Sequence, residues 1–386
     1  METIICGASA YQFWRTPPIV MLLAAGPSDH PVLRKSITED ELAAFRQNLV
    51  THLPLTRACA GGAAWRHVGP QQKAIRDNQL VMAPSMDLPV DVLVSSAHER
   101  RNSSFIKTTL WKDMLPTCST REIYEDFSVT SPAFTMLQLA RTASLTKTVL
   151  LASELCGTYA VYRAPAPVVV VLQKLIDRRR LPEIDGWRPC LTAEGKLTEL
   201  WSRPPLATPH DLIAMAAQSD SSSGRRRLFR ATELLKPMAA SPFETQAGVL
   251  LGFPKRLGGA GLERFTHNEK IELSSAARLL AQRECCYCDL FWPDGLDVEC
   301  QSARYHDNTE GHLSDSDRAA ALSLAGIDVL PLTYAQMKDP RRFAAFVLAA
   351  QRALGLRHTV RSEAHMAAER KLREEVLVDW WNLPRA

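Results

Sequence analysis

Residues 285–301 read Cys-Cys-Tyr-Cys-Asp-Leu-Phe-Trp-Pro-Asp-Gly-Leu-Asp-Val-Glu-Cys-Gln. Two short apolar runs on either side of a Pro-Asp-Gly turn are typical of a β-hairpin. If three residues form the loop, Trp292 pairs with Leu296, and counting back places Asp289 opposite Glu299. Like charges that face each other destabilise a ladder, whereas two carboxylates on one edge can hold Mg²⁺. The stretch therefore predicts an acidic hairpin that binds a divalent cation.

The sequence around this hairpin predicts helices and one more strand. Ser241 to Glu244 has the pattern of a helix-opening capping box. Gly326 ends a helix that is expected over 315–325, and the β-branched run 327–332 is expected to be a buried strand. An amphipathic helix over 337–354 closes the unit. This order predicts an α/β domain with a mixed sheet flanked by helices.

The first 160 residues predict a separate α+β domain. They contain an expected short strand or turn at 4–7 and an expected strand at 90–94. They also contain expected helices that are capped by Ser9, by Thr38 and by Ser131, the last with Pro132 at its first position. A further apolar helix over 145–156 ends at Gly157.

The remaining boundaries follow from composition. Prolines and the loop-like tract 219–224 indicate a connecting region over 161–240, and its arginine runs at 178–180 and 225–227 are typical of solvated surfaces. The predicted divisions are 1–160, 161–240, 241–355 and a charged C-terminal helix over 356–386 that ends near Trp380 and Trp381.

Composition indicates an ordinary globular protein. The chain has 386 residues, of which 46% are hydrophobic and 23% are charged, and its net charge of +4 permits a nucleic-acid partner. The apolar run 19–25 is too short to span a bilayer. Nine scattered cysteines without a secretory signal favour free thiols and a cytoplasmic location with no membrane partner. No P-loop, G-x-G-x-x-G, G-x-S-x-G or H-E-x-x-H motif is present.

An ordered set of short motifs carries a family resemblance. These motifs are Ser-Pro-Phe-Glu at 241–244, Asp-Leu-Phe-Trp-Pro at 289–293, Val-Glu-Cys-Gln at 298–301, Tyr-His at 305–306, Asp-x-x-Arg-x-x-x-Leu at 315–322 and Ala-Gly-Ile-Asp-Val-Leu at 325–330. Over about 115 residues the chain resembles the Vsr-type nuclease-like domains, relatives of very-short-patch-repair endonucleases. This resemblance implies a PD-(D/E)XK restriction-endonuclease-like core.

A second resemblance concerns residues 1–160. Ser9-Ala10, Val92-Leu93-Val94 and Ser131-Pro132-x-x-Thr135-x-x-x-Leu139-Ala140 are similar to the corresponding region of AbiEi-type abortive-infection antitoxins. The resemblance implies a region that binds a protein partner or an operator, as in toxin–antitoxin systems.

The nuclease resemblance assigns roles to four residues of this chain. Asp289 and Glu299 match the pair that holds Mg²⁺ (or Mn²⁺), which binds the scissile phosphate and activates water. Gln301 stands where the superfamily has a lysine, and it can orient water but cannot act as a general base. Glu244 matches a helix-borne carboxylate of the same site, with the alternative that it serves only the capping box.

Further candidates follow the hairpin. His306 is expected to move a proton or to contact phosphate, or else to be an inert loop residue. Arg304 and Arg318 are expected to contact phosphate, with the alternative that Arg318 pairs with Asp315.

Two other features have a structural reading. Cys285 and Cys288 form a C-x-x-C without a second ligand pair, so they are expected to be core thiols rather than zinc ligands. Phe291 and Trp292 are expected to be buried in the hairpin rather than to stack on bases.

The sequence leaves three functions open. The leading prediction is a Mg²⁺-dependent endonuclease that hydrolyses phosphodiester bonds in DNA, weakened by Gln301. The alternative is a non-catalytic AbiEi-like antitoxin or transcriptional regulator that uses the nuclease-like fold as a DNA- or protein-binding scaffold. An α/β protein of unrelated function is the third.

Overall fold

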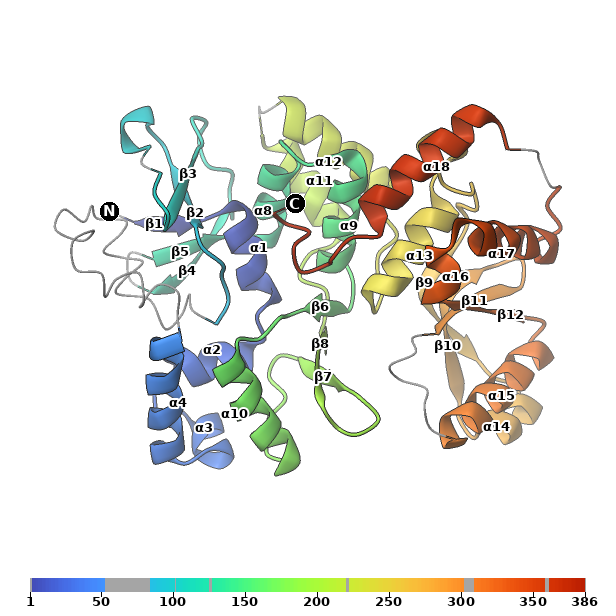
Figure 1. The fold of residues 1–386 in the computed structure, drawn as a ribbon, viewed down its shortest axis with the longest axis horizontal. Helices are drawn as coiled ribbons and strands as arrows, with labels where there is room; N and C mark the ends of the chain where they lie inside the picture. The colour runs from blue at the N-terminus through green and yellow to red at the C-terminus, as the bar shows by residue number, and fades with distance from the viewer. Residues whose placement is uncertain are drawn as a thin grey trace.

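The computed structural model describes residues 2–52, 84–100, 102–124, 127–219, 222–301, 309–357 and 361–385. Within these ranges the chain is a mixed α/β protein with three sheets and many flanking helices (Figure 1). Among the described residues, none of the helices combines the length and the apolar character that crossing a membrane requires.

A five-stranded mixed sheet organises the N-terminal part. Its order is β3-β2-β1-β5-β4, with β1 antiparallel to β2 and parallel to β5. The elements are β1 (Thr3–Ile5), α1 (Gly7–Arg15), α2 (Pro18–Ala25), α3 (Pro31–Ser36), α4 (Glu39–His52), β2 (Val90–Val94), η1 (Ala97–Glu99), β3 (Ile106–Leu110), β4 (Thr120–Tyr124), β5 (Phe127–Thr130), α8 (Pro132–Leu139) and α9 (Leu145–Leu155).

Most local predictions for this part are confirmed, but the cap of the first helix is different. Ser131 caps α8 and Thr38 accepts the backbone N–H of Glu41 at the start of α4. Ser9, however, lies inside α1, because the helix already begins after Cys6. The Ser9 hydroxyl instead accepts the backbone N–H of Asp91 at 2.9 Å, which fastens α1 to β2.

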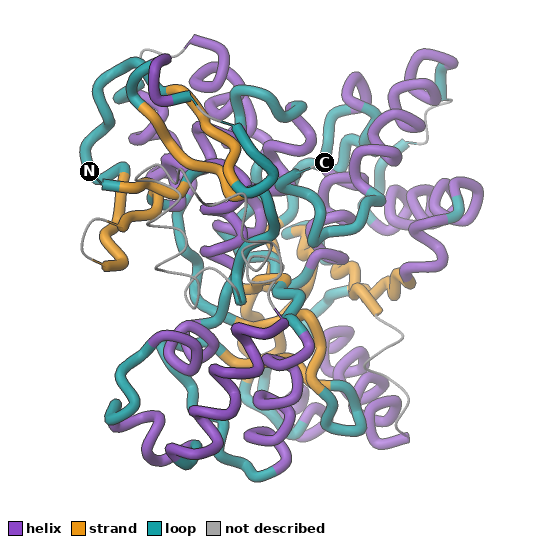
Figure 2. The backbone as a smooth tube through the Cα atoms, turned by 60° about the vertical axis from the view of Figure 1, so that its left-hand side comes forward, coloured by secondary structure: helices purple, strands orange, loops and turns teal. Residues whose placement is uncertain are grey.

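The stretch 161–240, expected to be a connecting region, has regular structure. It contains a three-stranded antiparallel sheet of order β6-β8-β7 and three helices, so the loop prediction for 222–224 is wrong. The elements are β6 (Tyr159–Val161), α10 (Ala166–Asp177), β7 (Arg188–Leu191), β8 (Leu197–Ser202), α11 (Pro209–Ala217) and α12 (Ser222–Leu234). Helices α2, α3, α4 and α10 gather below the first sheet (Figures 1 and 2).

The C-terminal part has a four-stranded mixed sheet of order β12-β11-β10-β9. Strands β9, β10 and β11 are antiparallel in turn, and β12 is parallel to β11. The elements are α13 (Pro242–Gly252), η2 (Lys255–Leu257), β9 (Thr266–Glu272), α14 (Ser275–Ala281), β10 (Cys285–Trp292), β11 (Leu296–Gln301), α15 (Thr309–Leu324), β12 (Asp328–Thr333), α16 (Tyr334–Lys338), α17 (Pro340–Ala353) and α18 (Glu363–Val376).

Both faces of this sheet carry apolar contacts. Leu290 and Val298 join the large cluster that includes α13, whereas Cys288 joins a smaller cluster with Ala277 of α14 and Leu322 of α15. The sheet is therefore enclosed by helices on two sides, as a mixed sheet with two apolar faces requires.

Three predictions around this sheet need correction. Helix α15 begins at Thr309, six residues before the expected start. Strand β12 is an edge strand with mostly half-buried or exposed residues, and only Leu332 in it is buried. The helix expected over 337–354 is broken at Asp339, whose carboxylate caps α17 by accepting the backbone N–H groups of Arg341 and Arg342.

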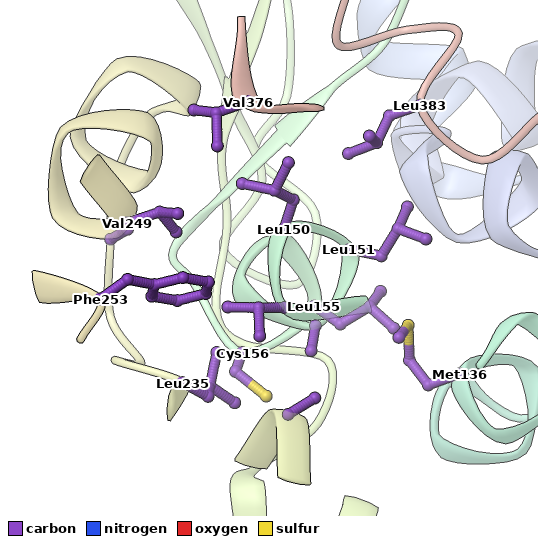
Figure 3. Packing of buried hydrophobic residues seen from close by; sticks show 14 of the residues in the cluster. Met136, Leu150, Leu151, Leu155, Cys156, Leu235, Val249, Phe253, Val376 and Leu383 are labelled. Carbon is purple, nitrogen blue, oxygen red and sulfur yellow. The ribbon is translucent and has the colours of Figure 1, made fainter. Parts of the chain in front are cut away.

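The largest hydrophobic cluster is centred on α9. Leu150 and Leu155 project between Phe253, which directly follows α13, and Met136 of α8, with Val376 at the end of α18 nearby (Figure 3). Because this cluster also includes Leu290 and Val298, the C-terminal sheet shares its core with the middle of the chain.

A buried ion pair lies beside this core. The guanidinium of Arg15 donates to both carboxylate oxygens of Glu154, at 2.8 and 2.6 Å, and both side chains are almost fully buried. Arg15 also donates to the carbonyl oxygens of Trp380 and Trp381. Helix α18 ends at Val376, so these tryptophans belong to a C-terminal segment that returns to α1.

Candidate functional site

The acidic hairpin has the predicted register, but its two strands separate at the acidic residues. Trp292 pairs with Leu296, and the pairing of β10 with β11 ends at Leu290 and Val298. Beyond that point β10 continues along β9 to residue 285, and β11 continues along β12 to residue 301. The next two residues, Asp289 and Glu299, therefore stand at a fork between the strands, and the ladder avoids a direct pairing of like charges.

Asp289 bridges this fork with its side chain. Its Oδ2 accepts the backbone N–H of Cys300 at 2.9 Å, which replaces a ladder hydrogen bond. Burial, and then the charges of Glu244 and Glu299, raise the pKa of Asp289 well above its ordinary value. A carboxyl in this position is held in an unfavourable electrostatic environment that a cation would relieve.

Glu244 forms only half of the predicted capping box, because its carboxylate accepts the backbone N–H of Ala240 rather than that of Ser241. Ser241 caps α13 by accepting the backbone N–H of Glu244 at 3.1 Å. The carboxylate of Glu244 accepts the backbone N–H of Ala240 at 2.7 Å and the side-chain amide of Asn268 at 2.9 Å. Although the residue is only 7% exposed, it lies close enough to Glu299 for that charge, after burial, to help raise its pKa to about 7.

Strand β9 supplies two residues that the sequence did not single out. Asn268 has a left-handed φ of +51° and interrupts the pairing of β9 with β10 opposite Asp289. Burial lowers the pKa of His267 to about 4, so the ring is neutral and its Nδ1–H donates to the Asp289 carbonyl at 3.1 Å. The sequence signal for the kink at Asn268 is weak. Asparagine tolerates a left-handed backbone, but it also occurs in many ordinary turns, so its presence does not indicate an interrupted strand.

Arg318 of α15 binds the acidic strand rather than standing free for phosphate. Its Nη1 lies 2.5 Å from Oε1 of Glu299, and its Nη2 lies 3.6 Å from Oδ2 of Asp297. Nη2 also donates to the carbonyl oxygen of Tyr287. The expected alternative partner, Asp315, has its side chain outside the described residues.

Asp297 and Glu299 have carboxylate oxygens without a close hydrogen bond. Asp297 is 0% exposed, and in the described part of the chain the Leu290 backbone N–H and the Cys288 thiol approach its carboxylate only at longer range. Burial, and then the charge of Glu299, raise the pKa of Asp297 to about 7, against the opposing effect of Arg318. Over the same described ranges, Oε2 of Glu299 has no hydrogen-bond partner.

The other predicted residues are placed as follows. Gln301 is the half-buried last residue of β11, two positions after Glu299 and on the same face of the strand. Arg304 and His306 lie outside the described residues. Cys288 is buried and in no disulfide, and Trp292 is 1% exposed, so both fill the core as predicted, whereas Cys285 and Phe291, also expected there, are only half-buried.

The donor set suits a hard divalent cation. Glu244, Asp289 and Glu299 offer only carboxylate oxygens, the ligands that Mg²⁺ and Mn²⁺ prefer, and Oε2 of Glu299 is unpartnered in the described structure. In their present arrangement, no three His, Cys, Asp or Glu side chains of the described residues form a group that could hold a metal. Glu299 is instead neutralised by Arg318.

The raised pKa of Glu244 makes stability depend on pH. With a folded pKa of about 7 and an ordinary value of 4.5, this carboxyl takes up a proton on folding between these two values. Stability therefore falls as pH rises through the window. We expect Glu244 by itself to make the free energy of unfolding about 2 kcal/mol lower at about pH 7.5 than at about pH 5. Urea unfolding across this range measures it.

Two variants control this prediction. Glu244→Gln removes this titrating group and is expected to make the profile shallower than that of wild type by about this amount, whereas Glu363→Gln, at an exposed position of α18, leaves it unchanged. A Glu244→Gln profile that falls as steeply as that of wild type contradicts the prediction.

Comparison of this chain with models of protein families, with curated proteins and with solved structures gives no match.

Proposed function

We propose that residues 241–355 form a Vsr-like PD-(D/E)XK domain that hydrolyses phosphodiester bonds in DNA with Mg²⁺ or Mn²⁺. The observation that carries the proposal is the convergence of Glu244, Asp289 and Glu299 from α13, β10 and β11 on one fork of the sheet. Burial, and after it the charges of the neighbouring carboxylates, raise the pKa of Glu244 and of Asp289. Repelling carboxylates that come from separate elements are typical of a site built for function rather than for stability.

Each residue has a distinct task in this proposal. Asp289 and Glu299, with Glu244 beside them, hold the cation, which neutralises the scissile phosphate and lowers the pKa of the attacking water. Asn268 orients Glu244 through its amide, and His267 fixes the backbone at Asp289. Gln301 orients water without taking its proton, so the chain supplies less general-base assistance than a lysine at that position.

The net charge of +4 is small for a DNA-binding protein. Phosphate contacts from Arg304, His306 and the arginines of α12 would supply an affinity that weakens with salt. The region 1–160, with its AbiEi-like features, would bind a partner or an operator and so direct the domain to its target.

One observation favours the non-catalytic alternative. The ion pair of Arg318 with Glu299 satisfies, without metal, a carboxylate that the proposed reaction needs. Together with Gln301, it supports a nuclease-like scaffold in an AbiEi-like antitoxin or regulator.

A plasmid-nicking assay separates the two functions. The full chain is incubated with supercoiled and single-stranded DNA in Mg²⁺ or Mn²⁺, with EDTA as the control. The proposal expects nicking that EDTA abolishes. Salt-sensitive DNA binding with neither metal-dependent nicking nor calorimetric uptake of Mn²⁺ would establish the regulator instead.

A further inference from the structure

Arg318 contacts Glu299 and two further acceptors on the neighbouring strands. Its Nη1 contacts Glu299, whereas its Nη2 faces Asp297 and donates to the Tyr287 carbonyl. The guanidinium thus spans three acceptors on two strands. Only one of them, Glu299, belongs to the proposed metal site.

We infer that Arg318 is an internal counter-ion, and that a divalent cation loads at the fork by displacing its guanidinium from Glu299 onto Asp297. The inference rests on the proposed metal site and concerns the regulation of that site.

Asp297 is the residue that makes this exchange feasible. A fully buried carboxylate approached only by a peptide N–H and a thiol needs a positive charge nearby, and Arg318 lies 3.6 Å from Asp297. If a metal takes Glu299, Arg318 can move closer to Asp297 while it keeps the Tyr287 carbonyl. Neither Arg318 nor Asp297 is then left as an uncompensated charge.

Glu299 is the carboxylate that the guanidinium and the cation would share. Its side chain is 23% exposed and its Oε1 is bound by Arg318, whereas its Oε2 is buried without a hydrogen-bond partner in the described ranges, so the cation gains this carboxylate when the guanidinium moves away. Because the guanidinium and the metal share one carboxylate, each weakens the binding of the other. The resting protein therefore binds metal more weakly than its carboxylates alone would.

Manganese binding to the full chain tests the inference. In calorimetry, Arg318→Met is expected to bind Mn²⁺ about tenfold or more tightly than wild type, since a competing charge is removed. Arg352→Met, at an exposed position on α17, is the matched control and leaves the affinity unchanged.

A second measurement on wild type covers the case in which Arg318→Met does not fold. In protein labelled at the arginine guanidinium groups, Mg²⁺ is expected to shift the NMR signal that Arg318→Lys removes, and Asp289→Asn is expected to abolish that shift. A signal that does not respond to saturating Mg²⁺ rejects the displacement.

The outcomes distinguish the inference from the proposed function. If Arg318→Met binds Mn²⁺ no more tightly than wild type, while Asp289→Asn still loses binding, the metal site stands and the competition is rejected. If neither wild type nor Arg318→Met binds Mn²⁺, both the metal site and the competition are rejected.

Discussion

Asp289→Asn is expected to lower metal-dependent DNA nicking to about one-thousandth of the wild-type rate or less, because a metal ion supplies several kcal/mol of transition-state stabilisation. Asparagine keeps an acceptor for the backbone N–H of Cys300 but loses the negative charge that would hold the cation. The nicking assay at saturating Mn²⁺ measures the loss.

The same substitution is expected to leave the protein at least as stable as wild type. Asp289 is repelled by Glu244 and Glu299, so removal of its charge relieves strain at the fork. Asp294→Asn, in the exposed turn of the same hairpin, controls for the change of residue type. Full nicking activity in Asp289→Asn would remove this residue from the site, and lost activity with lost stability would point to misfolding.

Glu154→Ala is expected to lower the free energy of unfolding by about 3–5 kcal/mol, since it leaves the buried Arg15 without its counter-charge. Glu154 also accepts from the Trp380 indole at 2.6 Å and from the backbone N–H of Val161 at 3.1 Å. Its loss therefore weakens contacts among α1, α9, β6 and the C-terminal segment. Denaturant unfolding followed by tryptophan fluorescence measures the change.

A double variant tests whether the loss of unfolding free energy in Glu154→Ala comes from the unpaired charge of Arg15. Arg15→Met combined with Glu154→Leu replaces the ion pair by apolar side chains and is expected to be more stable than Glu154→Ala alone. Glu183→Ala, which breaks the exposed pair with Arg188, is the surface control and is expected to unfold like wild type. Additive effects of the two single changes would contradict a coupled ion pair.

The hairpin could be predicted because its information is local. Gly295 adopts the left-handed φ of +94° that a three-residue turn requires, and this turn fixes the pairing of Trp292 with Leu296. The caps at Ser131 and Ser241 are local in the same way. The sequence alone therefore predicts which residues, Asp289 and Glu299, lie at the acidic fork.

The fork itself depends on contacts that are distant in sequence. It exists because β10 follows β9, and the polar sequence of β9 gave no strand signal. The ion pair of Arg318 with Glu299 depends on how α15 packs against the sheet. Neither turn chemistry nor periodicity specifies such packing.

The prediction that 161–240 is a connecting region is wrong for a different reason. Its prolines indicate loops by composition, yet Pro209 occupies the first turn of α11 and Pro165 precedes α10. Proline is favoured at these positions because the first helical N–H groups have no intrahelical partner. The number of prolines in a region therefore does not distinguish prolines that begin helices from prolines that interrupt them.

The carbonyl oxygens that Arg15 binds belong to Trp380 and Trp381, more than 360 residues later in the chain. Arg385 likewise donates to the carbonyl oxygens of Asp87 and Pro89. Because these partners are synthesised so much later than α1, the nascent N-terminal part stays incompletely packed until the segment around residues 380–385 has left the ribosome.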